Sequence, residues 1–343
     1  MLGHREVPQK PTESARIFCL LPYKHGVPVS PLESALLQVL ILRHLKPSRI
    51  NTSAKTKGGP SLPFLASRPQ FTQKGTSYGS LGFLSLALLL VASARSTKAQ
   101  QAAPPTAEQL AAISQRGRLL YEYDQAAWHA TDAVQMANPK AVEGQRYVAK
   151  KEDGKWRVVF GKLNDNGSRF DISYEADEQA TLRAFEVRKE PAERQDEGFF
   201  LFAERAIEVA MKDFGGVSRP YNVAVLPTAA DQLYVYLYPA QTKARVYPLG
   251  GDVKYLLNAD GKEILEKRQM HKTIVENPPS RKARKVVVGY HTHVLSDQPE
   301  DSDVFHVLTQ DPPVPEMILT PHFMYKVMTD GTIRIEKERK RKK

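Results

Sequence analysis

Two histidines and one aspartate near the carboxyl end of the chain have the types and spacing of a metal site. His291 and His293 are separated by one residue, and Asp303 follows ten positions after the second histidine. Side chains alternate along a strand, so the two imidazoles leave the strand on the same face. Two imidazoles and one carboxylate can hold Zn²⁺ and leave a fourth position for water. We therefore predict His291, His293 and Asp303 as metal ligands, with zinc as the metal.

A strand, a loop and a helix start would bring these three residues together. Residues 286–288 are three valines, and such a β-branched run bounded by charged and turn residues is typical of a buried strand. Pro299 suits the start of a helix because its φ is fixed and it has no N–H to donate. We expect a short helix over residues 299–308, which places Asp303 in its first turn.

The remaining sequence predicts an α+β fold with mostly antiparallel strands. Helical patterning runs from Thr106 to the breaker at Pro139, and a second helix is expected over residues 193–214. Asp260-Gly261 is the strongest hairpin signal. The expected strands are residues 146–148, 156–160, 169–174, 222–226, 232–238, 252–257, 263–268, 323–327 and 332–335. We thus expect two longer helices, one short helix after the His-x-His strand, and antiparallel sheets.

The positive charge of the chain lies in its two ends. Residues 1–99 hold 13 Lys and Arg and three acids, and the basic tail 337–343 holds six bases and one acid. Removing +10 for the first segment and +5 for the tail from the formal charge of +11 leaves the body near −4. This distribution argues against a nucleic-acid partner. The body is expected to contain a helix-and-strand region, 100–190, and an α+β domain with the motif, 191–336.

An apolar run over residues 81–94 predicts a secretory signal at residues 78–99. Small residues close the run, and we expect cleavage after Ala94 or Ala99. The run is shorter than the ~20 apolar residues that a membrane span needs, so only a transient membrane contact is expected. The predicted location is therefore periplasmic or extracellular.

Residues 1–77, ahead of this signal, are expected to be a disordered leader. A signal normally has a short basic segment before its apolar run, so we expect a translation start downstream of Met1. Sequencing the amino terminus of the natural protein tests this expectation. The single cysteine, Cys19, lies in the leader, so the body has no disulfide, thiol nucleophile or cysteine-based zinc site.

The order of elements around the motif resembles the core of the JAMM/MPN (JAB-type) zinc metalloproteases. The match covers roughly residues 285–336: a strand, His-x-His, a loop, a proline-led helix start with an aspartate, and two strands around an Asp-Gly turn. The resemblance implies that His291, His293 and Asp303 hold zinc. It also implies that Glu300 stands where the family has a serine that stabilises the intermediate, and that a glutamate from an earlier strand activates water.

The chain departs from this family pattern in the loop and in the base. Val294 stands where the family has a proline, and the loop to the aspartate is one residue shorter than usual. The family's base would be expected within residues 231–245, which contain no glutamate. Glu263 is retained as a catalytic candidate, although it lies closer to the motif than the family pattern has it.

Other histidines extend the set of candidate ligands. His306 lies three residues after Asp303 and shares its helix face, so it is an alternative ligand or a partner of a ligand. His271 and His322 are further candidates, for which a surface or hydrogen-bonded histidine is the simpler interpretation. A two-histidine, one-carboxylate Fe(II) site would use the same residue types as the zinc site.

Two functions remain open at this point. The first is an exported metal-dependent hydrolase that cuts an amide or peptide bond of an unknown protein or peptide with metal-activated water. The second is a non-catalytic extracytoplasmic interaction module in which His-x-His is structural and the aromatic strands bind a partner. Stoichiometric zinc that is lost in His291→Ala and Asp303→Ala would favour the first.

Overall fold

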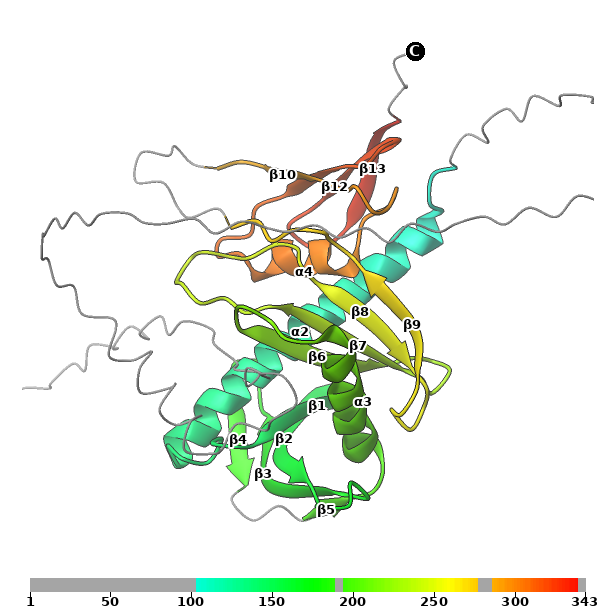
Figure 1. Cartoon of the computed structure of the whole chain (residues 1–343). Coiled ribbons are helices and arrows are strands. Elements are labelled where there is room, and N and C mark those ends of the chain that lie inside the picture. Colours follow the sequence, from blue (N-terminus) through cyan, green and yellow to red (C-terminus); the bar gives the residue numbers. More distant parts are fainter. Residues whose placement is uncertain (1–102, 189–193, 277–285, 339–343) are drawn as a thin grey trace, which may run out of the picture. The chain divides into compact units, whose positions relative to one another are not determined.

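The computed structural model describes residues 103–188, 194–276 and 286–338, which belong to one compact unit. This part contains three helices and three sheets (Figure 1), which confirms the predicted α+β fold class with mostly antiparallel strands. The predicted signal at residues 78–99, the leader before it and most of the basic tail lie outside the described residues. Among the described helices, none has both the length and the apolar character that crossing a membrane requires.

The longest helix, α2 (Ala107–Ala137), contacts all three sheets. It begins where the sequence predicts, because the Thr106 hydroxyl accepts the Gln109 N–H at 3.2 Å and the Gln109 side chain accepts the Thr106 N–H at 2.8 Å. It ends two residues before Pro139, as the breaker predicts. α2 also packs against helix α4 (Asp301–Thr309), so it helps to position the element that carries the predicted aspartate.

Two antiparallel sheets form the first two thirds of the described chain. The first has the order β1-β2-β3-β4 with β5 beside β3, and the second has the order β6-β7-β8-β9. Their strands are β1 (Arg146–Glu152), β2 (Lys155–Leu163), β3 (Phe170–Glu178), β4 (Phe185–Arg188), β5 (Gln195–Asp196), β6 (Tyr221–Pro227), β7 (Leu233–Pro239), β8 (Val253–Leu257) and β9 (Ile264–Gln269). All the strands predicted here are confirmed, whereas β4 and β5 had no counterpart in the prediction.

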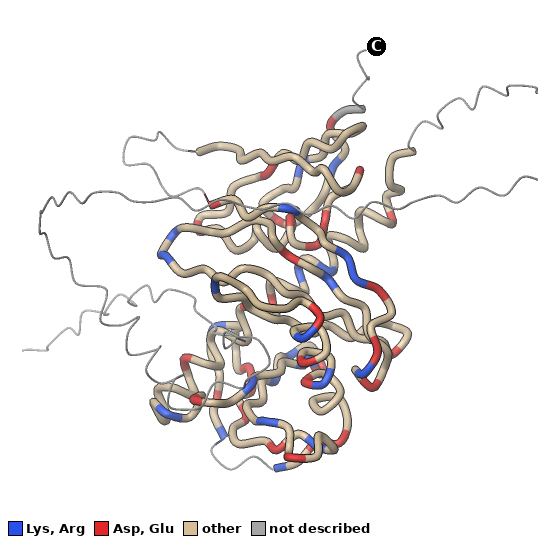
Figure 2. The backbone as a smooth tube through the Cα atoms, in the orientation of Figure 1, with Lys and Arg blue, Asp and Glu red and all other residues tan. Residues whose placement is uncertain are grey.

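Charged residues of both signs are interspersed along the described backbone (Figure 2). Several form pairs on neighbouring strands, such as Arg157 with Asp177 at 2.9 Å. Partly exposed pairs of this kind contribute at most about 1 kcal/mol each, so the described fold is held mainly by its apolar cores.

Helix α3 (Phe199–Phe214) starts six residues later than the predicted position 193. The preceding residues pair with β3 as β5, and Asp196 Oδ2 accepts the N–H groups of Gly198 and Leu201, each at 3.0 Å. A side chain that accepts these N–H groups fixes the first turn of the helix at this point.

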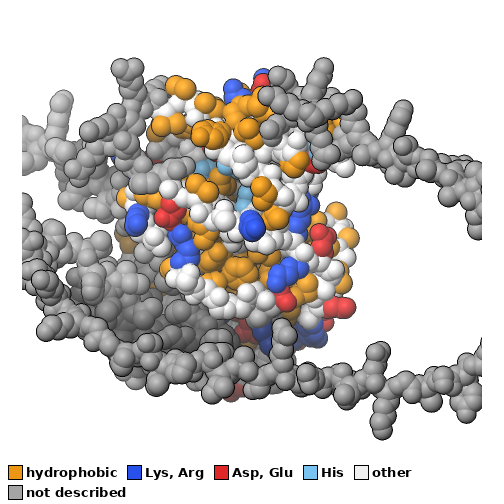
Figure 3. All heavy atoms as spheres, turned by 45° about the horizontal axis from the view of Figure 1, so that its top comes forward, with side chains coloured by type: hydrophobic (Ala, Val, Ile, Leu, Met, Phe, Trp, Pro, Cys, Tyr) orange, Lys and Arg blue, Asp and Glu red, His pale blue; other side chains and the backbone are white. Residues whose placement is uncertain are grey.

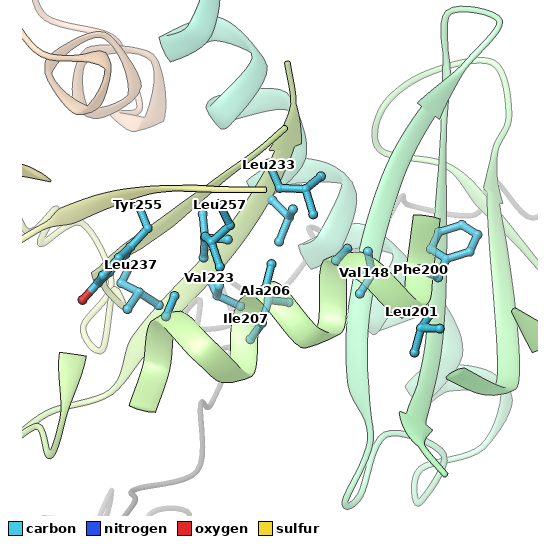
Figure 4. Close-up of a cluster of buried hydrophobic side chains, with 14 of the residues drawn as sticks. Val148, Phe200, Leu201, Ala206, Ile207, Val223, Leu233, Leu237, Tyr255 and Leu257 are labelled. Atoms are coloured by element: carbon cyan, nitrogen blue, oxygen red, sulfur yellow. The ribbon is translucent and has the colours of Figure 1, made fainter. Parts of the chain in front are cut away.

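A hydrophobic core joins α3 to the first and second sheets. Figure 4 shows Ile207 of α3 facing Val223 and Leu257 of the second sheet. Val148 of the first sheet belongs to the same buried cluster. Because this core combines side chains from both predicted regions of the body, the two regions pack as one body.

The third sheet carries the predicted motif. Its order is β10-β11-β12-β13, with β10 (Gly289–Thr292) parallel to β11 (Glu316–Leu319) and the other pairs antiparallel. β12 (Phe323–Val327) and β13 (Ile333–Glu338) confirm the predicted closing pair. The predicted short helix is α4, which connects β10 to β11 and begins two residues later than expected.

The prediction of a buried strand over residues 286–288 is wrong. The three valines are 41–72% exposed, and pairing starts only at Gly289, whose N–H donates to the Pro315 carbonyl at 2.8 Å. Extending the parallel register by one residue sets Val288 opposite Pro315, which has no N–H to donate. The ladder therefore ends there, and residues with a high strand propensity remain exposed before it.

Candidate metal centre

Four side chains from two sheets and one helix converge on one point. His271 follows β9 of the second sheet, His291 lies in β10, His293 follows β10, and Asp303 lies in the first turn of α4. One ligand atom of each lies within 4.8 Å of those of the other three. The structure thus brings the three predicted residues together and adds His271, which the motif did not include.

The spacing of these atoms fits one tetrahedral metal ion. His293 Nε2 lies 2.9 Å from His271 Nε2 and 3.0 Å from His291 Nε2. Asp303 Oδ1 lies 3.1, 3.0 and 3.4 Å from the Nε2 atoms of His271, His291 and His293, respectively. Ligands bound at 2.0–2.1 Å to zinc lie about 3.3 Å apart in a tetrahedron, so these five separations are close to what one such ion requires, and the sixth, between His271 and His291, is no longer than 4.8 Å.

The second ring nitrogen of each histidine is held by an acceptor. From Nδ1 to acceptor, the pairs are His271 with Asp252 Oδ1 at 2.8 Å, His291 with Glu316 Oε1 at 3.1 Å, and His293 with the Gln298 carbonyl at 3.0 Å. Carboxylate and carbonyl oxygens accept hydrogen bonds, so each Nδ1 carries the hydrogen. In this tautomer every neutral ring directs its Nε2 lone pair at the common centre, as metal-bound histidines do.

This convergence suits a cation. With a hydrogen on each Nδ1, the Nε2 lone pairs and the Asp303 carboxylate face one another, and a metal ion bound between them would satisfy all four groups.

The electrostatic environment of the cluster also favours positive charge. Burial disfavours the imidazolium form of His271, but the carboxylates of Asp252 and Asp303 outweigh it and raise its pKa well above the usual value. At His291 burial also lowers the pKa, but the Asp303 carboxylate outweighs this effect and raises the pKa of His291 to about 9. Burial would raise the pKa of Asp303, yet the three imidazoles hold it well below its usual range.

Asp303 is oriented by the start of its own helix. Its Oδ2 accepts the Glu300 N–H at 2.7 Å and also lies 3.3 Å from His293 Nε2, while Oδ1 faces all three imidazoles. Glu300 is the residue before the helix and Asp303 is the third residue in it, so the contact also satisfies an N–H at the helix start. The carboxylate is fully buried, and its direction is therefore fixed by bonds at both oxygens.

A second buried carboxylate anchors the start of α4. Asp301 accepts hydrogen bonds from Arg116 of α2 at 3.0 Å, from Lys254 of β8 at 2.8 Å and from Tyr236 of β7 at 2.9 Å. Gly117 permits the close approach of α2, because a Cβ there would lie 2.5 Å from the Asp301 carbonyl oxygen. α2 and the second sheet together set the position of the ligand aspartate two residues later.

The two glutamates predicted as catalytic lie outside the cluster. Glu300 pairs with Arg268 and accepts the Ser296 hydroxyl at 3.0 Å. Burial raises the pKa of the Glu300 carboxyl, against the opposing effect of Arg268. Glu263 is exposed in the turn between β8 and β9, at the end of β9 opposite to His271. Glu300 is thus a helix cap and ion-pair partner, and Glu263 lies on the order of 25 Å along the strand from the cluster.

His306 and His322 also lie outside the cluster. His306 is three residues beyond Asp303, and this step moves it about 4.5 Å along the helix axis. Its ring bonds to the Pro248 carbonyl, and burial lowers its pKa. His322 bonds to Asp297 at 2.7 Å. The third imidazole of the centre therefore comes from the second sheet and not from α4.

A cavity of about 550 Å³ opens onto the three imidazoles. One wall is formed by residues 270–275 with Leu249 and Gly250, and the other by residues 290–295. Figure 3 shows histidine atoms reaching the surface among hydrophobic side chains. Apart from the histidines, Lys272 is the one charged side chain among the described residues of these walls. The volume lies within the range of sites that bind small molecules or peptide side chains.

No spacing rule in the sequence links His271 to the motif, because it lies 20 positions before His291 and in another sheet. The predicted hairpin around Asp260-Gly261 could nevertheless have pointed to His271. Its register sets Val253 opposite Gln269, so Asp252 and His271 lie just beyond the same end of the hairpin. An acid and an imidazole at that place form the pair that a buried ligand histidine requires.

Comparisons with known protein families, with characterised proteins and with solved structures find no match to this chain.

Proposed function

We propose that this chain binds a divalent metal ion, zinc by preference, between His271, His291, His293 and Asp303. The observation that carries the proposal is the convergence of three Nε2 atoms and one carboxylate oxygen while every Nδ1 is held by an acceptor. Three nitrogens and one oxygen at near-tetrahedral spacing suit Zn²⁺. Mn²⁺ and Ca²⁺ prefer more oxygen ligands, and an Fe(II) site of the two-histidine type keeps positions open that His271 fills here.

Metal analysis of the full chain, purified without a histidine tag, tests the proposal. We expect about one zinc per chain in the natural sequence, and loss of that zinc in His271→Ala and Asp303→Ala. His322→Ala is the matched control, because His322 is also bonded to a carboxylate but lies outside the cluster. A folded protein that takes up no metal would contradict the proposal, as would unchanged zinc in His271→Ala.

Beyond metal binding, the cavity favours a specific activity, that of a hydrolase. The exposed edges of the imidazoles line a space of about 550 Å³, so a water molecule and an amide substrate have access to the metal position. A bound zinc would lower the pKa of a water molecule and polarise the carbonyl of the substrate. The resemblance to JAMM-type metalloproteases supports the same reaction class, and the predicted secretory signal supports an extracytoplasmic place for it.

The competing function is a non-catalytic exported module with a structural zinc. The filled fourth position supports it, because structural sites are closed while catalytic sites keep one position open. Replacing the native metal with Co²⁺ separates the two functions. A five-coordinate absorption spectrum that changes on adding an amide inhibitor, together with peptide hydrolysis, supports the hydrolase. An unchanging tetrahedral spectrum without hydrolysis supports the structural site.

A further inference from the structure

The strand that carries His291 has one unpaired edge in the described part of the chain. β10 is the first strand of its sheet and pairs with β11 alone. The N–H of Gly289 donates to the carbonyl of Pro315, just before β11, and the N–H of His293 donates to that of Leu319 in β11, each at 2.8 Å. Backbone direction alternates along a strand. The N–H and C=O groups of Tyr290 and Thr292 therefore point away from β11, toward the free edge.

Exposed apolar side chains are concentrated around this edge. Ten large hydrophobic residues are exposed in the described chain, and seven of them either line the cavity (four residues) or directly precede β10 (three residues). These are Val275, Val286, Val287, Val288, Tyr290, Val294 and Leu295, with Tyr290 at 77% and Val294 at 67% exposure. A strand edge with such residues readily pairs with another strand, and a cluster of exposed apolar residues marks an interaction site.

The same edge borders the metal centre. Residues 290–295 form one wall of the cavity onto which the three imidazoles open, and apart from His271 the described residues of the opposite wall include one charged side chain, Lys272. A strand added to β10 would lie about 4.8 Å from it. Its backbone would then pass along the cavity, and its alternate side chains would enter it.

We propose that the free edge of β10 binds an extended, apolar polypeptide segment as an added strand that passes beside the metal centre. The proposal deepens the proposed function, because this segment would be the substrate of that site. Outward backbone groups select an extended chain, the apolar rim selects its side chains, and the cavity accommodates them. The cavity favours a single segment over a second copy of the protein, because a single segment can direct side chains into it.

Fluorescence anisotropy with labelled pentapeptides tests the added strand. The probes are Thr-Val-Thr-Val-Thr, Ser-Leu-Ser-Leu-Ser and Ser-Phe-Ser-Phe-Ser, each capped at both ends, with a Ser-Glu-Ser-Glu-Ser control. We expect at least one apolar probe to bind and the acidic control not to bind. N-methylation of the alternate amides that face β10 should weaken binding about tenfold, while methylation of the intervening amides leaves it unchanged. Failure of all three probes, or equal effects at both sets of amides, overturns the proposal.

Matched variants locate the binding to this edge. Val294→Thr keeps the shape of the side chain and removes apolar contact, so it should weaken the probe several-fold. Leu265→Thr alters an exposed apolar residue on β9, outside the cavity walls, and should have no effect. Tyr290→Pro removes one outward N–H without removing a bond to β11, so it should abolish binding while zinc content is retained. Equal effects of Val294→Thr and Leu265→Thr would overturn the proposal.

Hydrogen exchange and metal content separate the remaining outcomes. The amides of Tyr290 and Thr292 should exchange fast in the free protein and become protected when the probe is added. Protection before the probe is added would assign the edge to a second copy or another segment of the chain, and overturns the proposal. Peptide binding by a protein that takes up no zinc would sustain this inference and remove the proposed function. Zinc uptake without peptide binding would sustain the proposed function and overturn this inference.

Discussion

Asp252 Oδ1 lies 2.8 Å from Nδ1 of His271, and this contact reaches the candidate metal centre from the second sheet. The carboxylate is buried, and its other oxygen has no partner among the described residues. Asp252 thus has one evident role, which is to hold the hydrogen on Nδ1 and direct Nε2 at the metal position.

Asp252→Asn should weaken zinc binding about 10–100-fold without abolishing folding. The amide keeps the size of the side chain but can place its NH₂ group against Nδ1 and favour the wrong tautomer. Competition with a chromophoric zinc chelator measures the affinity. Asp213→Asn is the control, because Asp213 pairs with Lys267 on the surface. Equal zinc affinity in Asp252→Asn and the natural protein would contradict this role.

Asp301→Asn should lower the free energy of unfolding by about 3–5 kcal/mol, because Arg116 and Lys254 would lose the carboxylate that neutralises them. Zinc affinity should fall as well, since the start of α4 would lose its anchor. Urea denaturation measures the first effect. Asp260→Asn removes a carboxylate from an exposed pair with Lys262 and should change stability by less than about 1 kcal/mol. Similar losses in both variants would refute the anchoring role.

Gly117→Ala should destabilise the protein by about 1–3 kcal/mol, although alanine is the better helix former. The added Cβ would lie 2.5 Å from the Asp301 carbonyl oxygen and from Val304 Cβ, so α2 and α4 would have to separate. Gln115→Ala, at an exposed position of the same helix, should be nearly neutral. Thermal unfolding followed by circular dichroism compares the two. A gain in stability at position 117 would show that the helices are not in close contact.

Stability should fall as pH rises toward 8, because of Glu204 in α3. Burial raises the pKa of this carboxyl to about 8, and Arg146 only partly opposes it. The folded protein therefore holds a proton between the unfolded value near 4.5 and pH 8 that the unfolded chain has lost. The contribution of this group is complete below that window and is lost across it. Urea denaturation at pH 5.5 and 8 should show a smaller difference in Glu204→Gln than in the natural protein, while Glu143→Gln, at an exposed position, keeps the full difference.

The residues of the site that local rules could predict are those that lie near one another in the sequence. Strand alternation places His291 and His293 together, and a proline-led helix start places Asp303 close by. His271 depends on the packing of the second sheet against the third, which no local pattern encodes. The prediction of a buried strand at residues 286–288 was wrong for a similar reason. Their own propensity favours a strand, but the partner position opposite Val288 is a proline in a segment about 27 residues away.

An ion held at this centre would connect the second sheet to the third sheet and α4, because His271 follows β9, His291 and His293 lie in or just after β10, and Asp303 lies in α4. A bound ion would act as a reversible cross-link between residues 271 and 303, which are 32 positions apart in the sequence. Its contribution to the stability of the folded state would depend on the zinc concentration. Chelation should then loosen β10 and the first turn of α4 from the second sheet, while the contacts of α2 with α4 and the third sheet remain. Proteases should cut these elements sooner once the metal is removed, so the lifetime of the protein would follow the supply of metal.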